Sequence, residues 1–431
     1  MLMKRYYYSN KKEISQLLKD NSEVGNKEQN DIVANILENI KENGYRAVRE
    51  YTGKFDGVLL DEQQFKVSQE EFDRAFDKVD EEFIEAVKLS IANVEDYHKK
   101  QMLDSYLEEK EDGVVLGQLV RPIERVGLYV PGGTAAYPSS VIMTAVPAKV
   151  AGVKEIVMIS PPDIHGEINP YTLSAAKLAG VTEVYKVGGA QGVGALAYGA
   201  GPLKRVDKIV GPGNIFVTIA KKMVYGAVDI DMLAGPSEIL VIADEGAKPE
   251  YIAADLLSQC EHDKLAASIL VTFSEDYANK VESEVAKQLD LLIRKGIAKE
   301  SLKSNGAVII VDSIEEALDF ANSYGPEHLE LAVAEPMNYL EGIKNAGAVF
   351  LGYFTPEPIG DYFAGPNHVL PTNGTSRFYS PLNTHTYLKK TSVISYTKEA
   401  LINKGKYIEK LAEVEGFGAH KNAVSVRLKD E

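Results

Sequence analysis

The chain has 431 residues, of which 45% are hydrophobic and 26% are charged, the composition of a globular protein with room for two or three compact units. Its formal net charge of -16 disfavours nucleic acid and anionic membrane surfaces as partners, because a negative field repels phosphate groups. The first residues lack the apolar stretch of a secretory signal, and no apolar run approaches the ~20 residues that cross a bilayer, so we expect a cytoplasmic protein.

The first hundred or so residues are predicted to be mainly helical. Ser68 followed by Glu71 is a capping-box pattern that marks the start of one helix. Two other stretches carry apolar residues at helical spacing. They are Ile32, Ile36, Leu37 and Ile40 in the first stretch, and Phe83, Val87, Ile91 and Val94 in the second.

From Val114 onward, short apolar runs alternate with helical patterns. This alternation predicts βαβ units and mostly parallel sheets covered on both faces. Because the strand candidates form two series, we expect two α/β units. The first series is Gly127–Val130, Glu155–Ser160, Glu183–Val187 and Lys208–Val210, and the second is Glu238–Ala243, Ala267–Thr272, Ala307–Val311 and Ala348–Leu351.

The chain between Gly352 and Glu399 is irregular and rich in proline, glycine and aromatic residues. Long irregular connections in compact proteins are usually functional or disordered, and the aromatic residues favour order here. Helical patterns resume near Glu399 and continue toward Arg427.

Three glycine-rich turns could present backbone amides to a phosphate. The turn Gly188–Ala195 follows a strand candidate and opens a helix, but it does not reproduce the G-x-G-x-x-G spacing or its downstream acidic residue, so a tight turn and a nucleotide site are equally good interpretations. Gly211–Asn214 and Val130–Gly133 have a similar setting. Three such turns in one unit favour nucleotide binding.

The seven histidines differ in what surrounds them. His98 and His165 lie among charged and loop residues, and we expect both to be solvated. His262 ends a predicted helix over 249–261, with Gln259 three residues before it on the same face. On this spacing alone, His262 balancing the helix dipole is the simpler interpretation, because a metal site needs further ligands from elsewhere.

Further acids and imidazoles occur in pairs along the C-terminal half. Glu327 precedes His328 directly, and the other pairs are Asp361 with His368 and Glu415 with His420. Each pair alone is more typical of a protein surface than of a catalytic site. The single cysteine, Cys260, rules out an intrachain disulfide and a zinc site of several thiolates from one chain, so any zinc would need nitrogen and oxygen ligands.

Taken together, seven motifs resemble the histidinol dehydrogenase family in their order and spacing. The resemblance covers nearly the whole chain and is strongest from Val126 to His420. The motifs are Val126–Gly133, Val210–Asn214, Ala234–Glu238, Leu256–His262, Gly325–Leu329, Gly360–Tyr362 and Gly365–Thr372.

The resemblance implies an α/β fold of two incomplete Rossmann-like units with parallel sheets, like that of aldehyde dehydrogenases, in an intertwined homodimer. The implied division has four parts. They are a helical N-terminal arm (1–25), a first Rossmann-like domain (26–128 plus 238–382), a second, NAD-binding one (129–237), and a dimer-swapped C-terminal domain (383–431).

The activity implied by the resemblance is the oxidation of L-histidinol through L-histidinaldehyde to L-histidine with two NAD, the last steps of histidine biosynthesis. One zinc per subunit would be held by Gln259, His262, Asp361 and His420, and would position the substrate. Glu327 and His328 would be the acid–base pair, with His328 taking the alcohol proton as a neutral imidazole and Glu327 activating water on the aldehyde.

The remaining implied contacts bind ligands. Substrate would contact Ser237, His368 and Glu415 as well as the zinc ligands and the acid–base pair, and NAD would contact Tyr129, Gln191 and Asn214. By the same resemblance, Glu415 and His420 would complete the partner's site. Some enzymes that oxidise aldehydes use a cysteine thiolate, but the motif shows no activating base beside Cys260, which we expect to pack in the interior.

Two other functions are less consistent with these residues. A zinc-dependent hydrolase of a small amino compound would use the same acids and imidazoles with a metal-bound water, but would leave the glycine-rich turns without a role. A sensor that merely binds zinc or NAD is disfavoured because Glu327 and His328 are both present.

Overall fold

The computed structural model describes residues 2–18, 25–132 and 136–429, and the predicted turn Val130–Gly133 therefore ends at a residue, Gly133, outside the described part. The chain forms two compact units. The first combines Met1–Gln101 with Glu124–Tyr387, and the second combines Met102–Ile123 with Leu388–Glu431.

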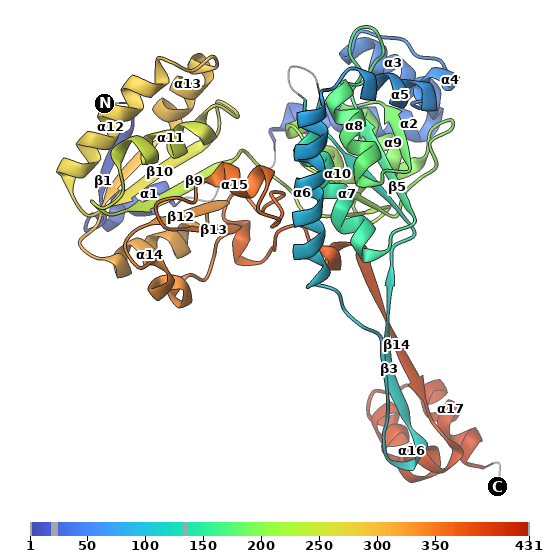
Figure 1. Ribbon diagram of the computed structural model, residues 1–431. Helices are drawn as coiled ribbons and strands as arrows, with labels where there is room; N and C mark the ends of the chain where they lie inside the picture. The colour runs from blue at the N-terminus through green and yellow to red at the C-terminus, as the bar shows by residue number, and fades with distance from the viewer. Residues whose placement is uncertain (1, 19–24, 133–135, 430–431) are drawn as a thin grey trace. The chain divides into compact units, whose positions relative to one another are not determined.

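The first unit contains a parallel six-stranded sheet in the order β1-β11-β10-β9-β12-β13 (Figure 1). Every residue of β9 and β12 is buried, as expected for strands covered on both faces. Helices α11, α12 and α13 pack on one face, and α1 and α14 pack on the other. The strands are β1 (Lys4–Tyr7), β9 (Glu238–Ala243), β10 (Ala267–Thr272), β11 (Ala307–Ile310), β12 (His328–Ala332) and β13 (Ala348–Leu351); the helices are α1 (Lys11–Leu17), α11 (Pro249–Cys260), α12 (Glu275–Leu289), α13 (Lys295–Asn305), α14 (Ile314–Tyr324) and α15 (Glu357–Tyr362).

A second parallel sheet, of five strands, belongs to the same unit and has the order β6-β5-β4-β7-β8. When the strands are numbered along the chain, with β4 as strand 1, this order is 3-2-1-4-5, which is that of a Rossmann sheet without its sixth strand. Helices α2, α3, α9 and α10 pack on one face, while α7 and α8 cover the other and contact α6. The strands are β4 (Arg125–Tyr129), β5 (Glu155–Ser160), β6 (Glu183–Lys186), β7 (Lys208–Val210) and β8 (Asp229–Ile230); the helices are α2 (Lys27–Asn43), α3 (Tyr45–Phe55), α4 (Glu62–Phe65), α5 (Gln69–Asp77), α6 (Glu81–Lys99), α7 (Pro138–Ala151), α8 (Pro170–Ala179), α9 (Gly189–Tyr198) and α10 (Ile215–Val224).

The second unit is a small antiparallel sheet with two helices. Its strand order is β14-β3-β2, and its helices α16 and α17 pack against each other. The bounds are β2 (Tyr106–Glu109), β3 (Val115–Pro122), β14 (Leu388–Ser395), α16 (Lys398–Val414) and α17 (Gly418–Leu428).

The predicted mixed α/β fold with parallel sheets is confirmed, and the eight strand candidates all lie on strands within one residue or two of the predicted bounds. The capping box of Ser68 and Glu71 is present at the start of α5. The described part of the predicted helical arm 1–25 contains helix α1, but it also contains strand β1, which pairs with β11.

The packing of the first hundred residues also differs from the prediction that grouped 26–128 with 238–382. Residues of α2 and α3 such as Val33, Ile40 and Val48 share a core with Tyr129 and Val157 of the five-stranded sheet. Helices α2 and α3 therefore pack with the five-stranded sheet, and the boundaries of the four-part division stay predictions.

The prediction that His98 is solvated was wrong. Its side chain is fully buried, and its Nδ1 lies 2.8 Å from the carbonyl oxygen of Val94, so burial lowers its pKa. The sequence pattern misled because the charged neighbours of His98 lie on the other side of the same helix. His165 is exposed, as predicted.

Helices long and apolar enough to cross a membrane are absent from the described residues.

Candidate active site

A large pocket in the first unit is lined by loops from both parallel sheets. The five-stranded sheet contributes the carboxyl ends of its strands, such as Tyr129 at the end of β4 and Pro212 after β7. The six-stranded sheet contributes the amino ends, with Glu238 opening β9 and His328 opening β12. The pocket therefore joins a Rossmann-type ligand-binding edge to a cluster of ionisable groups.

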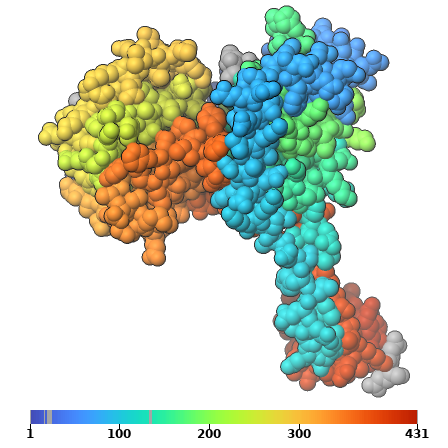
Figure 2. All heavy atoms as spheres, in the orientation of Figure 1, coloured from blue at the N-terminus to red at the C-terminus, as the bar shows by residue number. Residues whose placement is uncertain are grey.

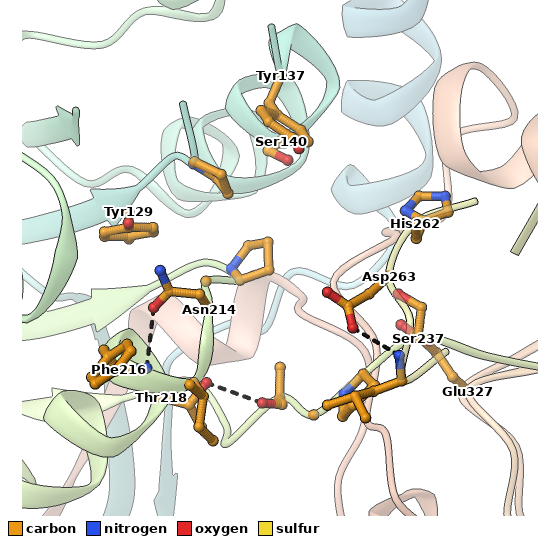
Figure 3. Close-up of a pocket in the computed structure, with 18 of the residues that line it drawn as sticks. Tyr129, Tyr137, Ser140, Asn214, Phe216, Thr218, Ser237, His262, Asp263 and Glu327 are labelled. Carbon is orange, nitrogen blue, oxygen red and sulfur yellow. Dashed lines mark hydrogen bonds between the residues drawn. The ribbon is translucent and has the colours of Figure 1, made fainter. Parts of the chain in front are cut away.

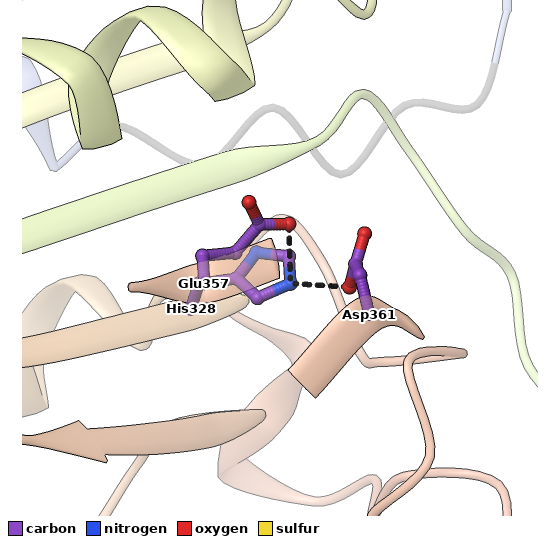
Figure 4. Close-up of side chains that lie close together, drawn as sticks. All are labelled: His328, Glu357 and Asp361. Atoms are coloured by element: carbon purple, nitrogen blue, oxygen red, sulfur yellow. Dashed lines mark ion pairs between the residues drawn. The ribbon is translucent and has the colours of Figure 1, made fainter. Parts of the chain in front are cut away.

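The centre of that cluster is His328, a buried imidazole among carboxylates. Its Nε2 lies 3.8 Å from Glu357 Oε1 and 3.8 Å from Asp361 Oδ1, and its Nδ1 lies 3.6 Å from Glu327 Oε2 (Figure 4). His328, Glu357 and Asp361 place one ligand atom each within 4.8 Å of one another, close enough to hold a metal ion. Glu357 and Asp361 face His328 together because they lie four residues apart on α15.

The segment that carries Asp361 is fixed in place by α6, which lies beside it (Figure 2). Ser90 Oγ donates to the carbonyl oxygen of Tyr362 at 2.7 Å, and Asn93 Nδ2 donates to that of Phe363 at 2.9 Å. These bonds hold the end of α15, so α6 has an indirect part in shaping the cluster.

The charges of the cluster shift one another's pKa. Burial alone would lower the pKa of His328, but Glu327, Asp361 and Glu357 outweigh it and raise that pKa to about 10. Burial raises the pKa of Glu327 to about 7 and that of Glu357 to about 8. Burial would raise the pKa of Asp361, but the nearby imidazoles of His328 and His368 outweigh it and lower that pKa.

A neutral imidazole at His328 was predicted from the sequence, whereas the carboxylates around it act in the opposite direction. The surrounding carboxylates raise the pKa of His328 and so favour its protonated form. The surplus of carboxylates around one imidazole is also the surrounding that a divalent cation requires.

Gln259 and Glu238 support the acid–base pair from behind. Gln259 Nε2 lies 2.9 Å from His328 Nδ1 and 3.3 Å from the carbonyl oxygen of Glu238, while Glu327 Oε2 accepts the N–H of Glu238 at 2.8 Å. Gln259 Oε1 is buried without a hydrogen-bond partner in the described structure. An amide oxygen in that state is free to bind a cation or a ligand.

Other predicted site residues of the first unit line the same pocket. His262 lies just beyond α11 and faces the pocket, where desolvation lowers its pKa and Asp361 acts in the opposite direction (Figure 3). His368 Nδ1 donates to the carbonyl oxygen of Asp361 at 3.0 Å, and Ser237 precedes β9. Ser237, Gln259, His262, Glu327, His328, Asp361 and His368 are thus assembled in one pocket.

Glu415 and His420 belong to the second unit. Glu415 directly follows α16, His420 lies in the first turn of α17, and both side chains are exposed. Their part in the site stays a prediction.

The predicted NAD contacts line the part of the pocket formed by the five-stranded sheet. The hydroxyl oxygen of Tyr129 accepts the N–H of Gly189 at 3.2 Å, and Asn214 Oδ1 accepts those of Phe216 and Val217 (Figure 3). Gln191 is buried in the first turn of α9. Side chains thus already bind the first amides of α9 and α10, which the sequence predicted to face a phosphate.

Two residues of this pocket were missed by the sequence analysis. Glu357 was detectable, because an acid four residues before Asp361 after a proline predicts two carboxylates on one helical face. Asp56, which approaches Gln191, had no local signal because 135 residues separate the two. Cys260 packs in the interior as predicted, with Sγ 3.0 Å from Ser268 Oγ, and burial raises the pKa of its thiol.

Comparisons with known proteins show which family the chain resembles. A family model described as histidinol dehydrogenase matches residues 19–428. The chain is 58% identical over 396 residues to the histidinol dehydrogenase of Heliobacterium mobile, covering 92% of this chain and 93% of the relative, and 56% identical over 394 residues to that of Clostridium acetobutylicum, covering 91% of each. The crystal structure of histidinol dehydrogenase from Elizabethkingia anophelis superposes with a TM-score of 0.93 at 42% identity, covering 99% of this chain and 98% of that one.

Proposed function

Because the chain belongs to the histidinol dehydrogenase family, we propose that it oxidises L-histidinol through L-histidinaldehyde to L-histidine, with two NAD as hydride acceptors and one zinc per subunit. The observation that carries the proposal is the pocket itself. One end presents His328 and Glu327, buried and in contact, and the other end is the ligand-binding edge of a Rossmann sheet.

We propose Gln259, His262, Asp361 and His420 as the zinc ligands. The unpartnered buried Gln259 Oε1 and the negative charge around Asp361 fit a cation, and all four donors are nitrogen or oxygen. When bound, zinc supplies a Lewis acid that orients the amino alcohol. Glu357 would then act from beside Asp361, since the two carboxylates share a face of α15.

The acid–base work falls to the adjacent pair. In each oxidation a hydroxyl proton must leave as hydride passes to the nicotinamide, and His328 Nε2 faces the pocket without a hydrogen-bond partner among the described residues. A cation bound beside Asp361 would lower the pKa of His328, because the charge of Asp361 is one of the causes that raise it. Between the two oxidations the aldehyde must be hydrated, and Glu327, with a pKa of about 7, suits the removal of a proton from water.

NAD would lie along the edge of the five-stranded sheet, near Tyr129, Gln191 and Asn214. The start of α7 also lines the pocket, and no side chain of the described residues caps its first amides. A helix start of that kind attracts a pyrophosphate. We therefore place the pyrophosphate nearer to α7 than to α9 or α10, whose first amides are already bonded.

The protein would act as a homodimer in the cytoplasm, with Ser237, His368 and Glu415 binding the substrate. Exposed apolar side chains on α16, on α17 and between them support a subunit interface there, because the surfaces of monomeric proteins rarely expose many apolar side chains together. They include Ile402, Tyr407, Ile408, Leu411, Val414, Phe417 and Val426.

Two substitutions test the proposal. His328→Ala should reduce NADH formation from L-histidinol by about 10²–10⁴-fold, the range typical of a lost general base. Glu327→Ala should chiefly reduce NADH formation from supplied L-histidinaldehyde. Equal losses of both variants in both assays would contradict the division of labour, and hydrolytic turnover by a wild type that forms no NADH would contradict the proposed function.

A further inference from the structure

The structure brings an acidic residue to the glycine-rich turn that lacks one in sequence. Asp56 follows the last residue of α3, and its Oδ2 accepts a hydrogen bond from Gln191 Nε2 at 3.4 Å. Asp56, Gln191, Gly189 and Tyr129 all line the pocket. In Rossmann sites a carboxylate binds the ribose hydroxyls of the adenosine half, and a carboxylate in that position opposes a 2′-phosphate by its charge.

The position of this group within the pocket decides which half of a dinucleotide it meets. Tyr129 and Gly189 belong to the carboxyl edge of the five-stranded sheet, whereas His328 opens β12 of the six-stranded sheet. The nicotinamide must reach His328 for hydride transfer. The adenosine half therefore lies toward Asp56.

The charge near Asp56 is negative and little compensated. Burial raises the pKa of its carboxyl to about 6, the hydrogen bond from Gln191 opposes this, and among the described residues no Lys or Arg contributes to the shift. Lys54 lines the same pocket, but its Nζ lies over the ring of Phe55, 5.3 Å from the centroid. Above pH 6 the carboxylate is therefore present and available to repel a phosphate.

We propose that Asp56 determines cofactor specificity: its carboxylate accepts hydrogen bonds from the adenosine ribose of NAD and repels the 2′-phosphate of NADP. The inference rests on the proposed function, since it takes a nicotinamide dinucleotide as the ligand. It assigns to Asp56 the role that the local sequence around Gly188–Ala195 leaves vacant.

Binding of NADH and NADPH at pH 8, followed by nucleotide fluorescence without turnover, tests the inference. Wild type should bind NADH more tightly than NADPH. Asp56→Asn should lower the affinity for NADH by roughly 10-fold or more, the value of a hydrogen bond to a charged group, while the affinity for NADPH stays equal or rises. The matched control is Glu50→Gln, which removes the same charge from an exposed position on α3 and should leave both affinities unchanged.

A second measurement uses wild type alone, so that it does not depend on the folding of the variant. ADP-ribose should displace NADH at a lower concentration than its 2′-phosphorylated form does. Equal displacement by the two, or an unchanged NADH-to-NADPH ratio in Asp56→Asn, would overturn the role of Asp56 and leave the proposed function intact. Failure of wild type to bind NADH at all would overturn both.

Discussion

A buried ion pair beneath one glycine-rich turn offers a sharp test of how the nucleotide side of the pocket is built. Lys221 of α10 and Asp231 are both almost fully buried and pair with each other. Lys221 Nζ also donates to the carbonyl oxygen of Gly211 at 2.9 Å, and Asp231 Oδ2 accepts the N–H of Gly211 at 2.7 Å. The pair thus holds both backbone groups of the residue that starts the turn Gly211–Asn214.

Replacing Lys221 by Met keeps the apolar stem and removes the ammonium. The carboxylate of Asp231 then stays buried with two backbone N–H donors, from Gly211 and Met232, but without its counter-charge. Breaking one side of a buried pair costs about 3–5 kcal/mol of unfolding free energy. Lys221→Met combined with Asp231→Asn should recover part of that loss, because no uncompensated charge remains.

Urea unfolding followed by far-ultraviolet circular dichroism measures the free energies, since the chain has no tryptophan to report by fluorescence. Lys222→Met, at the exposed neighbouring position, is the matched control and should change stability by no more than about 0.5 kcal/mol. An unfolding free energy of Lys221→Met within about 1 kcal/mol of that of wild type would refute the reasoning, because it is well below the loss expected for a broken buried pair. A double variant no more stable than Lys221→Met would refute it as well.

Three further predictions concern the turn, the acid at the nucleotide edge and the metal. Gly211→Ala should cost about 1–3 kcal/mol and weaken NADH binding, because Gly211 has φ +113° and an added Cβ would lie 2.3 Å from the carbonyl oxygen of Tyr129; unchanged urea midpoints would contradict this. The unfolding free energy of Asp56→Asn should rise relative to that of wild type as pH increases from 3.8 to about 6, and should not rise further above pH 6. The reason is that wild type loses stability over this range, because the buried Asp56 carboxyl has a higher pKa in the folded than in the unfolded protein. A difference in unfolding free energy that does not vary with pH would contradict the burial of this carboxylate. Removal of metal by a chelator should abolish NADH formation from L-histidinol until zinc is restored, while NADH binding persists; full turnover in metal-free protein, verified by metal analysis, would refute the ligand set.

Local patterns were enough to predict most strands of the two parallel sheets. Runs such as Glu238–Ala243 are continuously apolar because both of their faces are covered, and such runs stand out in a sequence without knowledge of their partners. The site residues of the first unit were found by resemblance to a family, and the structure places all ten of them around one pocket.

What the sequence missed depends on contacts between distant segments. The half-polar stretch Lys4–Tyr7 becomes a strand because β11 is there to pair with it. Asp56 reaches Gln191, and α2 reaches the five-stranded sheet, through packing alone. The raised pKa of His328 likewise arises from carboxylates brought together by folding, so the protonation of this imidazole could not be read from its neighbours in sequence.

The pairing of β1 with β11 affects how the six-stranded sheet forms during synthesis of the chain. Residues 4–7 are synthesised before residues 307–310, so the hydrogen bonds between the two strands form only after the later segment has been made. Deleting this segment would make β11 an edge strand with unpaired N–H and C=O groups, and a strand of another chain could then pair with it. N-terminal truncation should therefore promote aggregation even though it removes none of the residues proposed to bind the substrate.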